Sequence, residues 1–289
     1  MPKIIRLISI LAVCGLWGMA RPVSAQALIP HTLQLDQKKL EQQGLSLAQE
    51  AAQLGQFRQF ELALPRARLA SQLAPKNDKV WFLLGSLFVQ KKELDRAIDS
   101  FKKAQSLNPR KADVLFALGS AHFQQKKYKE AVAYYQRGLK VKPNDAEGLF
   151  DLGNGYYMLG RFSDAIAQYN KSVSNDQKFW PSINNIGLIM YEKGDANGAI
   201  KKWQSAVAIE KNAAEPLLAL AVAFNKKGDR QKAISMGKNA LDIDMRYANP
   251  DFLKENLWGK RLLKDAKRFL ELPPIQNIVE QKGNTVGAN

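Results

Sequence analysis

Apolar and polar positions along most of the chain recur with the spacing of amphipathic helices. From about residue 44 onward, large apolar side chains fall three or four positions apart, as Trp81, Leu84 and Phe88 do, and a second series including Phe101 follows. This spacing puts apolar side chains on one face of a helix. The pattern therefore predicts pairs of amphipathic helices joined by short turns.

The pattern repeats every 34 residues. Small residues mark the same place in each unit: Ala51, Gly85, Gly119, Gly153, Gly187 and Ala221. With units beginning at 44, 78, 112, 146, 180 and 214, position 20 is alanine six times (Ala63, Ala97, Ala131, Ala165, Ala199, Ala233). Position 27 is also small throughout (Ala70, Ala104, Gly138, Ser172, Ala206, Ala240). Because small residues let helices approach closely, we expect the two helices of each unit to pack through these positions.

Glycine and proline punctuate the units. Gly160, Gly194 and Gly228 occupy position 15, where a left-handed residue would end the first helix. Proline at position 32 (Pro75, Pro109, Pro143) would stop the second helix. The last three units carry Gln177, Lys211 and Met245 instead, and Pro65 lies inside the second helix of the first unit.

These features resemble the tetratricopeptide-repeat (TPR) family. Trp81, Leu84-Gly85, Phe88, Ala97, Phe101, Ala104 and Pro109 follow the family's motif, and the resemblance covers 44–247, about 70% of the chain. It implies an all-α fold, a right-handed TPR superhelix (α-solenoid) of six helix-turn-helix repeats with a C-terminal capping helix. The repeats are 44–77, 78–111, 112–145, 146–179, 180–213 and 214–247. We expect a leader and N-terminal cap at 26–43, a capping helix at 248–272 and a disordered tail at 273–289.

The first 25 residues are typical of a secretory signal peptide. Lys3 and Arg6 precede an apolar run from Leu7 to Ala20, and Val23-Ser24-Ala25 offers a small-residue cleavage site. An uncleaved anchor is the alternative, but the run is shorter than the ~20 residues that span a bilayer. A lipoprotein site at Cys14 fits poorly, because Cys14 lies in the middle of the apolar run. We expect cleavage after Ala25 and export from the cytoplasm.

Composition narrows the possible chemistry. The chain has 289 residues, 46% hydrophobic and 24% charged, enough to bury a large core. Cleavage would remove the single cysteine, and with it any disulfide or thiolate site. It would also remove three of the 43 basic residues and no acid, leaving 40 against 27, a net charge of +13. Such a charge favours anionic partners or surfaces.

Little in the chain suggests catalysis. Only His31 and His122 are present, and neither has an acid or metal-ligand pair beside it. His122 falls at an expected packing position. The glycines from Gly153 to Gly160 lie within a predicted helix and follow no strand, which argues against a phosphate-binding loop. We predict no enzymatic activity, no cofactor and no metal site.

The TPR resemblance implies a binding surface on the concave face, formed by positions 2, 5, 9, 12 and 13 of the first helices. Position 5 carries Phe82, Phe116, Phe150 and Asn184, and position 12 carries Phe123, Tyr157 and Tyr191, with Asn154 beside them. This double stripe predicts a groove for an apolar or aromatic peptide segment of a client protein. The alternative is that several of these rings pack between neighbouring helices.

Two further expectations concern partners. The segment from Phe252 to Leu263 resembles the tails of TPR proteins from cyanobacteria and the chloroplast lumen. This resemblance implies a periplasm or thylakoid lumen as the compartment and a role in assembling photosynthetic complexes. Alternatively, lysine clusters such as Lys102-Lys103, Lys126-Lys127 and Lys201-Lys202 could form a basic convex face for an anionic membrane or cell-wall polymer. That face would make the chain a cell-envelope scaffold. Nucleic acid is not an expected partner.

Overall fold

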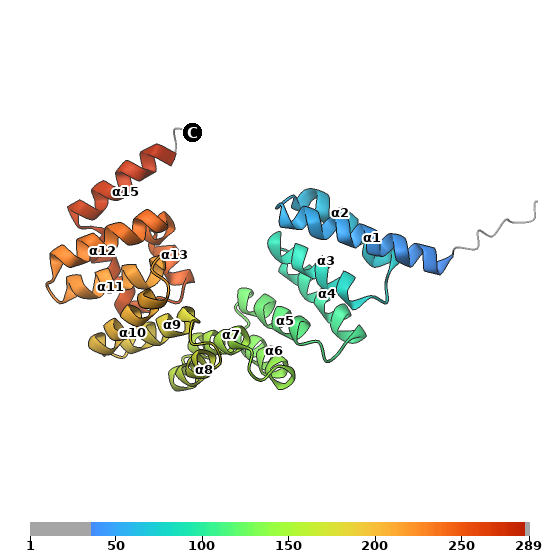
Figure 1. The fold of residues 1–289 in the computed structure, drawn as a ribbon, viewed down its shortest axis with the longest axis horizontal. Helices are drawn as coiled ribbons and strands as arrows, with labels where there is room; N and C mark the ends of the chain where they lie inside the picture. The colour runs from blue at the N-terminus through green and yellow to red at the C-terminus, as the bar shows by residue number, and fades with distance from the viewer. Residues whose placement is uncertain (1–35, 287–289) are drawn as a thin grey trace, which may run out of the picture. The chain divides into compact units, whose positions relative to one another are not determined.

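The structure, a computed structural model, describes residues 36–286, with side chains through Gln281 (Figure 1). The predicted signal peptide (1–25) and the first ten residues of the leader lie outside the described residues. Within the described range the chain is helical and has no strands. The helices belong to one compact unit, Gln37–Asn289. None of the described helices is long and apolar enough to cross a membrane.

Twelve helices form six pairs, and we call the first member of each pair helix A and the second helix B. The A helices are α1 (Gln37–Gln56), α3 (Asp78–Gln90), α5 (Ala112–Gln124), α7 (Ala146–Met158), α9 (Trp180–Glu192) and α11 (Ala214–Lys226). The B helices are α2 (Phe60–Leu73), α4 (Leu94–Leu107), α6 (Tyr128–Val141), α8 (Phe162–Asn175), α10 (Ala196–Ile209) and α12 (Arg230–Ile243). Each helix packs mainly on the helices before and after it. This arrangement is a TPR solenoid.

Close packing inside each repeat explains the 34-residue pattern of small residues. The alanines at position 20 are buried completely, and position 27 is buried as well. The glycines at position 8 face an aromatic ring at position 24 of the same repeat. An added Cβ would lie 2.6 Å from Phe101 at Gly85 and 2.5 Å from Trp203 at Gly187. Each ring therefore lies directly against the backbone of helix A.

The first and last repeats lack both the glycine at position 8 and the aromatic residue at position 24. Position 8 is Ala51 or Ala221, and position 24 is Ala67 or Gly237. At Gly237 the space is taken by Phe269 from a C-terminal helix, which an added Cβ would meet at 2.5 Å. The C-terminal region thus supplies the ring that the last repeat does not carry.

The turn between helix A and helix B uses a left-handed residue in all six repeats. The predicted glycines Gly160, Gly194 and Gly228 have φ of 72°, 94° and 89°. The equivalent residues of the first three repeats, Arg58, Lys92 and Lys126, adopt φ of 57°, 59° and 61° although they carry a Cβ. The repeated packing therefore imposes this conformation even where the residue type disfavours it.

Helix B ends at the same place whether or not proline follows. α2, α4 and α6 end two residues before Pro75, Pro109 and Pro143, and α8, α10 and α12 end at the equivalent positions without proline. Pro65 is accommodated within α2. Proline thus accompanies the end of helix B but is not required for it.

The C-terminal region differs from the predicted capping helix and tail. It forms a 3-10 turn (Met245–Ala248), α13 (Pro250–Glu255), α14 (Lys260–Leu270) and α15 (Pro273–Val286). The prediction of a disordered tail at 273–289 is wrong for 273–286. Pro273-Pro274 begins α15, because proline suits the first turn of a helix. Ile275 is buried, and Ile278 and Val279 pack against the same core.

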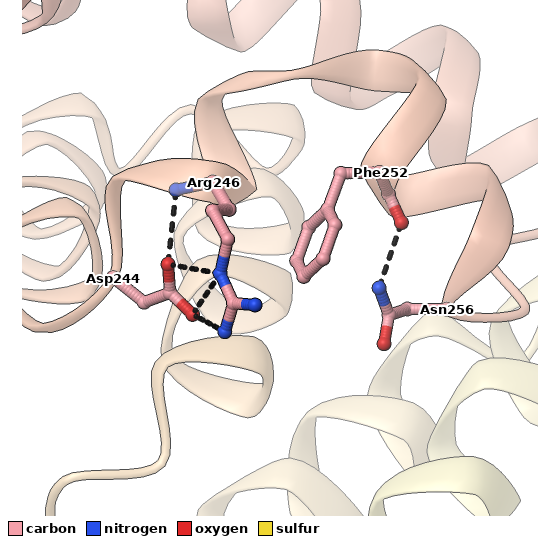
Figure 2. A network of polar contacts seen from close by, with 4 residues as sticks. All are labelled: Asp244, Arg246, Phe252 and Asn256. Atoms are coloured by element: carbon pink, nitrogen blue, oxygen red, sulfur yellow. Dashed lines mark hydrogen bonds and ion pairs between the residues drawn. The ribbon is translucent and has the colours of Figure 1, made fainter. Parts of the chain in front are cut away.

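A small polar network shapes the turn that leads from α12 into α13 (Figure 2). The Arg246 guanidinium donates to both carboxylate oxygens of Asp244, and its Cζ lies 4.9 Å from the centre of the Phe252 ring. The Asn256 side chain donates to the Phe252 carbonyl oxygen at 2.8 Å, near the end of α13. These contacts lie within the segment that leads from the end of α12 through α13.

Candidate functional site

The four predicted groove residues at position 5 take part in packing between helices. The Phe116 ring lies against Gly138 of α6 and Gly148 of α7, where an added Cβ would approach within 2.4 Å and 2.6 Å. The Phe150 ring centre is 5.5 Å from that of Phe179, and the Phe82 ring centre is 5.6 Å from that of Phe101. Asn184 is buried. At position 5 the structure favours the packing interpretation over an open stripe.

Asn184 belongs to a buried polar cluster between α7 and α9. Its side-chain nitrogen donates to Asn185 Oδ1 at 3.0 Å, and its backbone oxygen accepts from Trp203 Nε1. Asn154, another predicted groove residue, accepts hydrogen bonds from Tyr169 Oη at 2.7 Å and Asn185 Nδ2 at 2.9 Å. These contacts join neighbouring repeats, and burial keeps Asn184 away from a peptide in the groove.

At position 12, two of the three predicted aromatic residues bind the chain's own C-terminal segment. Tyr157 Oη donates to the Leu257 carbonyl oxygen at 2.7 Å, and Tyr191 Oη donates to Asp265 Oδ2 at 2.9 Å. Burial raises the pKa of both phenols, so each remains an O–H donor. α14 packs against α9 and α11, which are both A helices. The C-terminal segment therefore covers the helix A face of the last repeats.

Two glutamates anchor this segment, and the sequence analysis did not identify either of them. The Glu192 carboxylate accepts from the backbone N–H groups of Arg261 at 3.0 Å and Leu262 at 2.8 Å, the first turn of α14. A carboxylate at a helix N-terminus satisfies free N–H groups and complements the helix dipole. Glu215 accepts from Nε1 of the buried Trp258 at 3.0 Å. Both glutamates come from helix A.

Two acids in the A helices have unusual proton affinities. Burial raises the pKa of Glu215 to about 7, and hydrogen bonds from Trp258 and Asn184 oppose this rise. Burial also raises the pKa of Asp151 to about 7, with a further rise from the nearby charges of Glu147 and Asp145. Both carboxyls therefore change charge near neutral pH.

An open groove remains beside the earlier repeats. It encloses about 830 Å³ and is bounded by the turn after α3, by α5 and α6, by Met158, and by α13. Its apolar lining is Leu94, Phe123, Met158 and Leu257. Phe123 is half-buried and makes an edge contact with Tyr128, with ring centres 5.2 Å apart. Of the predicted aromatic residues, Phe123 is the one that lines this open space.

The structure also shows what surrounds His122 and which acids some of the lysines contact. His122 is buried and stacks on Tyr134 at 5.3 Å, and burial lowers the pKa of its imidazole. No group of three potential metal ligands occurs among residues 36–286. Two lysines pair with acids of their own repeat, Lys111 with Asp78 at 3.0 Å and Lys142 with Asp113 at 2.7 Å. These lysines are thus engaged in contacts within a repeat.

Six helix pairs with a 34-residue period and a groove beside the earlier repeats define a protein of the TPR class. The profile of the cytochrome c-type biogenesis protein H TPR domain matches residues 25–174, just over half of the chain, and a second TPR-repeat profile matches 187–228. The chain belongs to this family of TPR domains. TPR proteins bind protein or peptide partners, and their repeat scaffolds are typically not enzymes.

Solved structures agree on the fold. PilF from Pseudomonas aeruginosa is 19% identical, with a TM-score of 0.61, over 76% of this chain and 97% of PilF. PilW, a type IV pilus biogenesis factor, is 19% identical, with a TM-score of 0.62, over 73% of this chain and 97% of PilW. A chain of the Cut9–Hcn1 structure of the APC/C is 18% identical, with a TM-score of 0.62. The match covers 82% of this chain and 46% of that chain. No curated protein sequence matches the chain.

Proposed function

We propose that this chain is an exported scaffold or assembly factor that holds an apolar or aromatic segment of a client protein. The open groove lined by Leu94, Phe123, Met158 and Leu257 carries this proposal. Its volume of about 830 Å³ is comparable with that of ligand-binding clefts, which are roughly 300–1,000 Å³. An aromatic ring that is half-buried in such a groove is a suitable anchor for a client side chain.

The proposed site is narrower than the stripe that the sequence predicted. The phenol groups of Tyr157 and Tyr191 are bound by the C-terminal segment, and position 5 is packed between helices. Leu257 of that segment forms part of the groove wall. The client would therefore contact the early repeats and the C-terminal segment together.

The rim of the groove can orient a peptide. Gln124, Lys92 and Lys126 lie on the repeat side, and Asp251 and Glu255 lie on α13. These groups can donate to carbonyl oxygens and accept from N–H groups of an extended backbone. A polar rim around an apolar floor is the usual arrangement at peptide-binding surfaces.

The proposed compartment and process rest on separate considerations. The predicted signal peptide supports a role outside the cytoplasm. The family's name, taken from cytochrome c-type biogenesis, supports assembly of an exported complex. The tail's resemblance to cyanobacterial and chloroplast-lumen TPR proteins supports a photosynthetic complex as the narrower candidate. A cell-envelope scaffold is less well supported, because Lys111 and Lys142 are paired with acids of their own repeats.

A displayed peptide library tests the groove directly. Peptides selected on the chain from Gln26 onward should be enriched in aromatic and large apolar residues, and Phe123→Ala should weaken their binding about tenfold or more. Phe57→Ala is the matched control, because Phe57 is 75% exposed in the turn after α1, outside the groove. Selection of no apolar motif, or equal loss in both variants, would show that the groove is not the client site.

A further inference from the structure

α14 presents two chemically different faces. Leu262, Ala266 and Phe269 are completely buried in the core formed with the last repeats. The exposed face of this helix carries five cations: Lys260, Arg261, Lys264, Lys267 and Arg268. We call these five residues the basic strip. They lie on a helix that covers helix A of the last repeats, not on the predicted convex lysine clusters.

Three acids, Asp251, Asp265 and Glu271, lie near the basic strip. Among the described residues, no ion pair joins any of its five side chains to a carboxylate. The one acid of α14, Asp265, is buried and is held by Tyr191 Oη at 2.9 Å and Lys226 Nζ at 3.3 Å. The carboxylate of Glu192 is engaged by backbone N–H groups of α14. The positive charge of the strip is therefore available to a partner.

Hollows run along both sides of the strip. One, of about 640 Å³, lies between α13 and α14, where half-buried Leu263 is flanked by Lys260, Lys264 and Lys267. The other, of about 540 Å³, lies beside Tyr191 and is lined by Lys226, Arg261 and Arg268. Asp251 and Glu271 line the first hollow. Each hollow can receive a narrow chain whose acidic side chains reach the cations.

We propose that the basic strip docks an Asp/Glu-rich peptide segment of a protein partner. From Lys260 to Arg268 the helix rises about 12 Å, a length that roughly four extended residues cover. Leu263 offers a contact for one apolar side chain between the acids. A membrane surface fits less well, because helices that bind bilayers insert an apolar face, and the apolar face of α14 is buried in the core. This surface is separate from the groove lined by Phe123.

Fluorescence anisotropy with a labelled peptide of about ten alternating Glu and Asp residues tests the proposal at low salt, about 50 mM. The triple variant Lys264→Gln/Lys267→Gln/Arg268→Gln should weaken binding about tenfold. The control, Lys102→Gln/Lys103→Gln/Lys140→Gln, removes the same charge from α4 and α6 and should change binding less than about twofold. Equal weakening in both triples, or no binding by the wild-type chain, would overturn the proposal.

Two further measurements distinguish a peptide site from a membrane site and from a folding defect in the triple variant. In the unmutated chain, the peptide should protect Lys264 and Lys267 from acetylation more than Lys102 and Lys103, a result that does not depend on any variant folding.

Vesicles containing anionic lipid are tested alongside the peptide. Vesicle binding that requires the basic strip, without peptide binding, would replace the proposal with a membrane role. A client that is lost with Phe123→Ala while peptide binding to the strip persists would leave this proposal intact.

Discussion

Replacing Gly85 by alanine should destabilise the second repeat, although alanine is the better helix former. Helix propensity alone favours alanine by about 1 kcal/mol. The new Cβ would lie 2.6 Å from both Cδ1 and Cε1 of Phe101, whose side chain is buried in the core. Forcing one extra methyl group into a packed core costs roughly 1–3 kcal/mol. Because the clash is with ring atoms, we expect the upper part of that range and a net loss of about 1–2 kcal/mol.

Urea unfolding followed by far-UV circular dichroism measures this loss, and a double-mutant cycle identifies its cause. Phe101→Ala by itself should cost roughly 3–5 kcal/mol, because it leaves a cavity in the core. In that background Gly85→Ala should become neutral or stabilising, since the clashing ring is gone. The first and last repeats show this combination naturally, with Ala51 and Ala221 in repeats that lack an aromatic residue at position 24.

Gly55→Ala provides the matched control. Gly55 is also in an A helix, but its added Cβ would meet only the terminal methyl Cδ2 of Leu87, at 3.2 Å. This variant should be neutral or slightly stabilised. If Gly85→Ala were as stable as the wild-type chain, or equally destabilising with and without the Phe101 ring, close packing would not be the reason for glycine at position 8.

Three further predictions concern the turn, the acids Glu215 and Asp151, and the C-terminal segment. Lys126→Gly should raise the free energy of unfolding by roughly 1 kcal/mol, measured in urea, because Lys126 has φ of 61°. Stability should fall as pH rises from about 4.5 to 7, because the folded-state pKa values of Glu215 and Asp151 are about 7, above their ordinary 4.5 and 3.8. Above pH 7, each acid should lower the free energy of unfolding by on the order of 3 kcal/mol. At a pH low enough to protonate the acid in both the folded and the unfolded chain, it should have no such effect. Glu215→Gln and Asp151→Asn should each flatten this pH slope in urea titrations, and an unchanged slope in both would contradict the assignment. Glu192→Ala should speed hydrogen exchange at the Leu262 amide and leave α1–α8 unchanged, whereas uniform acceleration would point to global destabilisation.

The candidate site could be predicted only in part. The resemblance to TPR repeats directed attention to positions 5 and 12, yet Phe116 and Phe150 fill spaces between helices while Phe123 lines an open groove. Both kinds of position carry aromatic residues at helical spacing, so their sequence signals are the same. Glu192 and Glu215 gave no signal, because a lone glutamate in an amphipathic helix is ordinarily a solvated residue.

The sequence by itself determined the repeats of this protein. Helix A and helix B of one repeat are close in the chain, so their packing partners recur at a constant offset, as Gly85 and Phe101 do. These contacts appear in the sequence as a 34-residue period because helix A and helix B pack in the same way in successive repeats. The position of each turn and each close helix contact follows from that period.

Only the tertiary structure decided where the C-terminal segment lies. It is held by pairs far apart in the chain, such as Tyr157 with Leu257, 100 residues away, and Glu192 with Leu262, 70 residues away. No repeat relates these partners, and each contact occurs once. Phe269 reaches Gly237 because the last repeat leaves a space where the four middle repeats carry a ring. The path of a segment that is not repeated depends on the surface that the completed solenoid presents, and that surface exists only after the repeats have packed.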